Sequence, residues 1–94
     1  MPSRTLERIR ALVRERRYVM TLHAEEEMEQ DGLRIGDVEN AILTGRIVDR
    51  QTDRRSRERK YLVRGPSVDA TQAVVAVVKF GPTDLLLILT VYAD

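Results

Sequence analysis

The stretch Gln72–Ala93, with the sequence QAVVAVVKFGPTDLLLILTVYA, contains two β-rich runs joined by a predicted turn. Two runs rich in Val, Leu and Ile flank Gly81-Pro82-Thr83-Asp84, whose residues are typical of a turn. The pattern predicts an antiparallel hairpin in which Phe80 faces Leu85. In that register one face is wholly apolar and must be buried; it comprises Val74, Ala76, Val78, Phe80, Leu85, Leu87, Leu89 and Val91.

Three helices are predicted before this hairpin. Pro2-Ser3 offers an N-cap for a helix to about Arg17, in which apolar residues recur every three or four positions: Leu6, Ile9, Leu12 and Val13. Thr21 caps a second helix, Leu22–Asp31, and Gly32 stands where a left-handed residue commonly ends a helix. A third helix is expected over Asp37–Thr44, with Gly45 as its stop. Tyr18 to Met20 is expected to be extended or a turn.

The remaining segments predict the rest of a sheet. Ile47-Val48 is a short strand candidate, Asp49–Arg59 is a polar stretch without periodicity and is expected to be a loop, and Lys60–Val68 is a further strand. The sequence therefore predicts one α+β domain over residues 1–94. Its N-terminal helices, at about residues 3–45, pack on one face of a small antiparallel sheet of three to four strands at residues 60–93.

Composition excludes several classes of site. The chain has 94 residues, no cysteine and one histidine, so disulfides, cysteine nucleophiles and structural zinc sites are not expected. We expect no cofactor and no metal. The longest apolar run, Leu85 to Leu89, is far shorter than the ~20 residues of a membrane helix, and no signal-like segment opens the chain. A soluble cytoplasmic protein is the expectation, without a membrane partner.

The nearly neutral net charge of +1 conceals three charged segments. Residues 1–19 carry a net charge of +4, residues 25–39 a net charge of −6, and residues 46–64 a net charge of +5. Solvated helix faces that balance one another explain such a pattern, and so does a basic groove for phosphates. Both interpretations remain open at this point.

Alternation along the predicted strands places a group of polar residues on the face of the sheet away from the helices. If Tyr61 and Val63 turn toward the helices, then Lys60, Arg64, Thr90 and Tyr92 share the open face. Lys79 is expected on this face too, but too far along the strand from Tyr92 to share a site with it.

The order of several short motifs resembles a known prokaryotic family. The motifs are His23-Ala24, Asp37-Val38, Gly45, Tyr61-Leu62 and Thr90-Val91-Tyr92. Together they resemble the family known as domain of unknown function 4258, which is itself similar to metal-independent ribonucleases of the RelE and barnase type and to MqsR-like toxins. The resemblance implies an RNA-cleaving toxin of a toxin–antitoxin pair, with RNA as substrate and an antitoxin protein as partner.

Cleavage of RNA through its 2′-hydroxyl requires a base, an acid and a cation, and this chain offers candidates for each. His23 is the candidate base, Lys60, Arg64 or Arg59 the cation, and Tyr92 or Tyr61 the phenolic donor. Tyr61 is expected in the core, so Tyr92 is the preferred donor. The predicted catalytic residues are His23, Lys60 and Tyr92, and the predicted RNA-binding residues are Arg59, Arg64 and Thr90. A lone histidine in the first turn of a helix is, however, often structural.

A second class of function is a silent interaction module of the same fold. In this interpretation the acidic helix binds a basic partner, or the edge of Leu85 to Tyr92 pairs with a partner strand or with a second copy in a homodimer. Glu27 and Asp31 favour it, because many members of the family carry arginine at these two positions. The arginines between Arg50 and Arg59 are either a mobile solvated loop or a clamp for RNA or an acidic partner.

Overall fold

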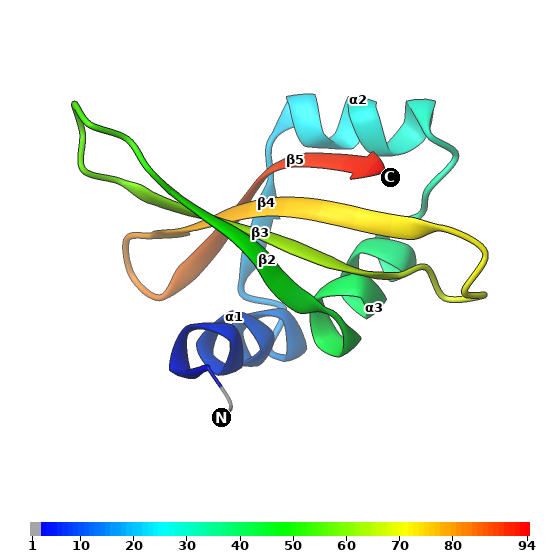
Figure 1. Cartoon of the computed structure of the whole chain (residues 1–94), viewed down its shortest axis with the longest axis horizontal. Coiled ribbons are helices and arrows are strands. Elements are labelled where there is room, and N and C mark those ends of the chain that lie inside the picture. The colour runs from blue at the N-terminus through cyan, green and yellow to red at the C-terminus, as the bar shows by residue number, and fades with distance from the viewer. Residues whose placement is uncertain (1–2) are drawn as a thin grey trace.

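The computed structural model describes residues 3–94, and in them three helices flank one mixed sheet of five strands (Figure 1). The predicted α+β class is confirmed, although the sheet has five strands rather than three or four. The elements are α1 (Arg4–Arg14), β1 (Tyr18–Met20), α2 (Leu22–Gln30), α3 (Ile35–Thr44), β2 (Arg46–Thr52), β3 (Arg59–Pro66), β4 (Ala73–Gly81) and β5 (Leu85–Ala93). The strand order is β1-β5-β4-β3-β2, with β1 parallel to β5 and the other pairs antiparallel.

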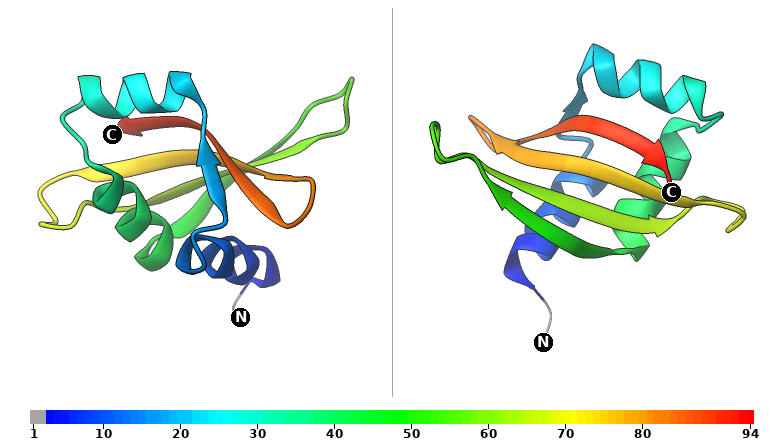
Figure 2. Two further views of the ribbon diagram at one scale, coloured as in Figure 1. Left: turned by 180° about the vertical axis from the view of Figure 1, so that it is seen from behind. Right: turned by 45° about the horizontal axis from the view of Figure 1, so that its top comes forward.

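The helices cover the sheet unequally. The views in Figure 2 place α1 and α3 against one face, whereas α2 lies along the outer side of β5. The core between helices and sheet is aliphatic, and its largest fully buried side chains are Ile9, Val38, Ile42, Val63, Val74, Val78, Leu86, Ile88 and Val91. The opposite face of the sheet carries no helix of the described chain and is left open (Figure 2).

The three predicted helices are confirmed, with shifted ends. Ser3 caps α1 by accepting a hydrogen bond from the Leu6 amide at 3.3 Å, while Pro2 lies outside the described residues. The helix ends at Arg14 rather than near Arg17, because the chain turns into β1 through Arg16 at a positive φ of 57°. Thr21 caps α2 as predicted, and α3 begins at Ile35, two residues earlier than expected.

The segment Tyr18–Met20, predicted only as extended or a turn, is the parallel edge strand β1. Its tyrosine connects the strand to α3, because the Tyr18 hydroxyl donates a 2.7 Å hydrogen bond to Glu39 Oε2. Burial, and then the hydrogen bond and the charge of Glu39, raise the pKa of Tyr18 to about 12. The phenol therefore stays protonated well beyond neutral pH and fixes β1 to the helix layer.

The predicted register of the β4–β5 hairpin is wrong by one residue at the turn. Phe80 pairs with Leu86, and Gly81 pairs with Leu85, so the loop has three residues rather than four. A shift of one residue exchanges the two faces of a strand. Leu86 and Ile88 are therefore buried in place of the predicted core residues Leu85, Leu87 and Leu89. A bulge beside Val77 and Val78 restores the predicted orientation further along, so that Val91 is buried as expected.

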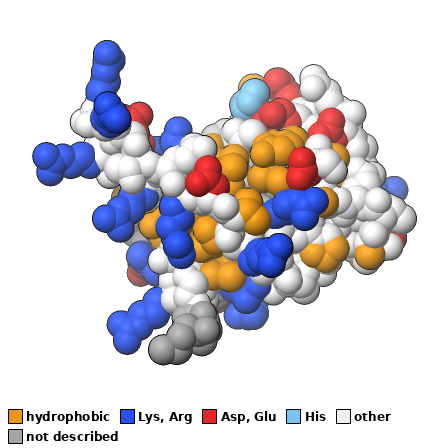
Figure 3. Space-filling view, viewed as in Figure 1, with side chains coloured by type: hydrophobic (Ala, Val, Ile, Leu, Met, Phe, Trp, Pro, Cys, Tyr) orange, Lys and Arg blue, Asp and Glu red, His pale blue; other side chains and the backbone are white. Residues whose placement is uncertain are grey.

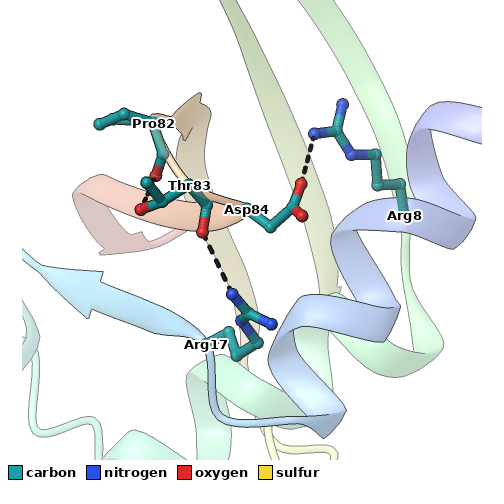
Figure 4. Close-up of polar contacts among 5 residues, drawn as sticks. All are labelled: Arg8, Arg17, Pro82, Thr83 and Asp84. Carbon is teal, nitrogen blue, oxygen red and sulfur yellow. Dashed lines mark hydrogen bonds and ion pairs between the residues drawn. The ribbon is translucent and has the colours of Figure 1, made fainter.

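The three-residue turn depends on non-glycine residues in the left-handed region. Thr83 and Asp84 have φ of 59° and 53°, a conformation that costs free energy for residues with a Cβ. Helix α1 and the segment after it stabilise this turn: Arg8 pairs with the Asp84 carboxylate at 3.4 Å, and Arg17 donates to the Thr83 carbonyl at 3.1 Å (Figure 4). The Thr83 hydroxyl also donates to the Pro82 carbonyl at 2.6 Å.

The expected loop at Asp49–Arg59 is instead a regular hairpin. Strand β2 continues to Thr52 and β3 begins at Arg59, so only the residues between these two positions form a turn. Backbone amides of Ser56 and Arg55 donate to the Asp53 carboxylate, which lowers the pKa of Asp53 and fixes the turn. We call residues 49–60 the arm, because Figure 1 shows this hairpin projecting beyond the helices. Without a helix over it the arm buries little, so its sequence lacks the apolar alternation that identifies strands.

Helix α3 approaches β3 with almost no space for side chains at two glycines. A Cβ atom on Gly65 would clash with the backbone of Ala41, and a Cβ on Gly45 would clash with the carbonyls of Arg64 and Ala41. Arg10 of α1 holds the same place, because its guanidinium donates to the carbonyls of Ile42 and Gly45. The three contacts fix α1, α3 and β3 relative to one another.

This close approach predicts that Gly65→Ala destabilises the protein strongly. The added methyl must separate α3 from β3, and overpacking of this kind typically costs about 1–3 kcal/mol or more. Gly36→Ala is the matched control, because its Cβ would meet only Val68 Cγ2 at 3.8 Å and lies in a helix, where alanine is favoured over glycine by up to about 1 kcal/mol. Urea unfolding of both variants measures the difference. Equal stabilities would contradict the close approach.

Candidate functional site

The open face of the sheet can be described row by row, because partners across a ladder point to the same side. One row contains Arg46, Arg64, Val75 and Tyr92, and the next contains Asp49, Leu62, Val77 and Thr90. Beyond them Lys79 pairs with Leu87, and Lys60 pairs with Gln51. Figure 3 shows this face, with hydrophobic side chains over the middle of the sheet and Lys and Arg around them.

Three of the predicted residues lie together at one end of this face. Tyr92 and Arg64 stand on either side of Val75 in one row, and Thr90 is two residues from Tyr92 on the same side of β5. Adjacent strands lie ~4.8 Å apart, so the Cα atoms of Tyr92 and Arg64 are separated by roughly 10 Å. Arg64 is oriented by Asp94, whose carboxylate accepts from Arg64 Nε at 2.8 Å. A phenol, a hydroxyl and a guanidinium thus share one surface.

Lys60 is on the open face as predicted, but it does not join this group. It precedes Arg64 by four residues on β3, which is roughly 13 Å along the strand. Its position near Lys79 places two lysines toward the arm end of the sheet. Lys79 forms an ion pair of 3.1 Å with Glu58 of the arm. The lysines therefore belong to a different part of the face from Tyr92.

Arg59 lies on the other side of the sheet. It pairs with Thr52, and the neighbouring pair on the same side is Arg50 with Tyr61. Tyr61 is buried on the helix side, as expected from the sequence, and its ring contacts Phe80 edge to face at 6.0 Å between centroids. Arg59 and Tyr92 are therefore on opposite faces.

His23 lies in the first turn of α2 rather than on the sheet. Its side chain is 68% exposed, and Nε2 lies 3.0 Å from Oε1 of Glu27, one helical turn later. The same Glu27 oxygen accepts a 3.4 Å hydrogen bond from the Val91 amide at the outer side of β5. A carboxylate thus orients the imidazole and connects it to the strand that carries Tyr92.

Two acidic residues of α2 have a role that the sequence did not reveal. The Asp31 carboxylate accepts a 2.7 Å hydrogen bond from the Ala93 amide, just as Glu27 accepts from Val91. Asp31 is the C-cap of α2, where the helix dipole disfavours negative charge. Its use is therefore to bind β5. The only signal in the sequence is an unpaired acid at the wrong end of a helix.

The expectation that β5 has a free edge is wrong, because β1 and the two carboxylates cover its outer side. The segment Leu86–Ile88 pairs with β1, and beyond it the two carboxylates of α2 occupy the Val91 and Ala93 amides. Strands β1 and β2 are the edges of the sheet. Partner binding through the outer side of β5, or through the carboxylates of Glu27 and Asp31, would first require these contacts to break.

Comparison with known proteins decides the family. The sequence pattern of the family described as Domain of unknown function (DUF4258) matches residues 20–93, most of the chain. The chain belongs to this family. The match begins at Met20, the last residue of β1, so that α1 lies outside the matched region. No curated protein and no solved structure matches the chain.

In this DUF4258 protein a hollow lies away from the predicted residues. It has a volume of about 580 Å³ and lies between the start of α3 and the turn that joins β3 to β4, with Arg34, Gly36, Val68 and Asp69 among its lining. Its carboxylates are already bound within the chain: Asp37 accepts from the Val68 amide, and Asp69 accepts from Thr71 and Ser67. The hydrogen bonds from Thr71 and Ser67 lower the pKa of Asp69. These contacts stabilise the β3–β4 turn.

Two further classes of feature are absent from residues 3–94. No helix in this range has the length and apolar character needed to cross a membrane. No three side chains of the His, Cys, Asp and Glu types cluster there in a way that could hold a metal ion.

The role of Asp31 at the side of β5 predicts a measurable loss of stability. Asp31→Ala leaves the Ala93 amide without its acceptor, and because this hydrogen bond is exposed to solvent we expect a loss of about 0.5–1.5 kcal/mol. Glu29→Ala is the control, because Glu29 is exposed on the same helix and substitutions of this kind usually change stability by less than about 0.5 kcal/mol. Thermal and urea unfolding test the pair. If both variants are equally stable, Asp31 does not hold α2 to the sheet.

Proposed function

We propose that this protein is a metal-independent endoribonuclease of the cytoplasm that cleaves RNA lying across the open face of its sheet. The observation that carries the proposal is the group of Tyr92, Thr90 and Arg64 at one end of that face. A proton donor and a fixed cation on an uncovered surface are two of the three groups that cleavage through the 2′-hydroxyl requires.

The charge of the arm supports a polyanionic substrate. Residues 49–60 carry five Arg and one Lys against two Asp and one Glu, and the arm projects from the end of the sheet away from the C-terminus. The negative charges of the arm are engaged locally, since Asp53 fixes the turn, Asp49 accepts from Gln51 and Glu58 pairs with Lys79. The guanidinium groups of Arg54, Arg55 and Arg57 at the tip form no ion pair within residues 3–94 and are free to neutralise phosphates, which is the dominant source of affinity for nucleic acids.

The proposed reaction is an internal transesterification. The 2′-oxygen forms a bond to phosphorus while its proton passes to a base, and the bond from phosphorus to the 5′-oxygen breaks as that oxygen receives a proton. The products are a 2′,3′-cyclic phosphate and a 5′-hydroxyl end. Tyr92 is the proton donor to the leaving oxygen, and Arg64 stabilises the charge that develops on the phosphoryl oxygens.

His23 is the base in this scheme. The pair that it forms with Glu27 leaves Nδ1 for the substrate and resembles the base with an orienting carboxylate that occurs in many acid–base sites. Substrate that contacts both His23 and Tyr92 must cross from α2 over the rim of β5. Lys60 lies too far along β3 to take part in the same step and instead serves, in this proposal, to bind the continuing strand of RNA.

We propose that such a nuclease acts as a toxin, as the sequence resemblance implies, with an antitoxin as its natural inhibitor.

A second candidate function has its own support. Leu62, Val77 and Leu87 are only partly buried on the open face, and Val75 lies among them, so the middle of that face is apolar. A protein partner that covers these side chains would make the protein an interaction module without catalysis.

We predict that the purified protein cleaves mixed-sequence RNA in EDTA and that Tyr92→Phe lowers the rate by about 100-fold or more, the usual contribution of a positioned acid. His23→Ala is expected to lose a similar factor. Glu29→Ala on α2 and Arg14→Gln on α1 are the matched controls, because both side chains are exposed outside the proposed site. Gel analysis of the cleavage products measures rate and end chemistry together.

Two outcomes would contradict this assignment. Full activity of folded Tyr92→Phe and His23→Ala variants would remove the proposed acid and base. Absence of cleavage by the wild-type protein, with or without ribosomes, would leave the interaction module as the better explanation. Variants that disrupt the apolar middle of the face, such as Leu87→Glu, would then be expected to abolish binding of the partner.

A further inference from the structure

A second, separate hollow lies on the helix side of the arm. It has a volume of about 310 Å³ and is lined by Thr5 of α1, by Arg50, Gln51 and Thr52 of β2, and by Arg59 and Tyr61 of β3. The ladder explains this grouping, because Arg50 pairs with Tyr61 and Thr52 pairs with Arg59 on the same side of the hairpin. The hollow is therefore on the opposite face of the sheet from Tyr92.

Tyr61 is one of the residues that line this hollow. Tyr61 is only 7% exposed, and its ring packs against Phe80. Its hydroxyl has no hydrogen-bond partner among residues 3–94. Within this range, every side-chain N or O atom that is fully buried does have a partner. The oxygen must therefore reach solvent through the hollow that it lines. Buried tyrosines usually place this group against a partner.

The charges around the hollow are of one sign. The guanidinium groups of Arg50 and Arg59 form no ion pair or hydrogen bond with any side chain of residues 3–94, and the six lining residues include no acid. Diagonal neighbours on a hairpin lie roughly 7–8 Å apart, so the two cations face a common space. Hydroxyl groups of Thr5, Thr52 and Tyr61 add further donors around it.

We propose that this hollow is a binding site for a phosphate group. Two guanidinium groups and three hydroxyl groups provide many donors and no competing carboxylate, which matches the several acceptor oxygens and the charge of a phosphate better than a single carboxylate. The phosphate can come from two sources, a terminal phosphomonoester or an internal phosphodiester of a nucleic acid. This site does not depend on ribonuclease activity, because it shares no residue with the proposed catalytic group.

The test is a titration of the full chain with inorganic phosphate, followed by NMR of the backbone amides and the arginine Nε–Hε groups at constant ionic strength. We expect saturable shifts at Arg50 and Arg59 that chloride does not produce. Tyr61→Phe and Arg59→Gln are each expected to weaken binding about tenfold, the effect of losing one hydrogen bond to a charged group. Thr52→Val is a further variant on the exposed side of the hollow, in case Tyr61→Phe alters the core.

Arg54→Gln is the matched control, because it removes the same charge from the tip of the arm but does not line the hollow. Its affinity for phosphate should stay within about twofold of the wild type, since exposed charges at a distance are screened. Adenosine 5′-monophosphate and the dinucleotide ApA distinguish the sources: tighter binding of the first supports a terminal phosphate, and tighter binding of the second an internal one. No saturable shift with any of these probes, or equal losses in Arg54→Gln and Arg59→Gln, would overturn the proposal.

Discussion

The close contact between α3 and β3 is the constraint on which the other parts of the structure depend. Backbone meets backbone at Gly65 and Gly45, and Arg10 of α1 binds the carbonyls where α3 ends. Because these contacts bring α1 and α3 to the same face, the aliphatic core forms on that side alone. The opposite face is left to solvent, and there Tyr92, Thr90 and Arg64 lie free of the helices.

Two acidic residues at α2 cover the outer side of β5. A strand with unpaired amides invites pairing with other chains, yet β5 is occupied by β1 along Leu86–Ile88 and by Glu27 and Asp31 beyond it. Glu27 also orients His23, so one carboxylate joins the structural contact to the candidate base. Glu27 and Asp31 are thus used inside the molecule, whereas Glu25, Glu26 and Glu29 of the same helix remain exposed.

Residues that cap or end a helix predicted the helices well, whereas the pairing of strands that are distant in sequence could not be predicted. Thr21 and Gly32 mark the ends of α2 through contacts within a few residues, so these ends were predictable. The register of β4 and β5 was not, because it depends on Thr83 and Asp84 adopting left-handed backbone conformations that are rare for such residues. The strand Tyr18–Met20 is too short to carry a pattern, and its pairing with β5 spans more than sixty residues of sequence.

The candidate site was predictable only where alternation alone decides a face. Lys60, Arg64, Thr90 and Tyr92 are on the open face as alternation indicated, although Lys60 lies well apart along the strand. Arg59 belongs to the other face, in the hollow beside Tyr61, because the arm is a hairpin and not a loop. That difference arises because an arm without a helix above it needs no apolar alternation, and so its strands have no pattern to recognise.

Mapping the contacts of an RNA that cannot be cleaved would show directly whether RNA binds across the open face. Backbone amide NMR of the full chain would be recorded during titration with a short 2′-O-methyl RNA. Binding across the open face predicts saturable shifts at Arg64, Thr90 and Tyr92 together with the arm. Shifts confined to α3 and the β3–β4 turn, or no saturable shift at all, would contradict it.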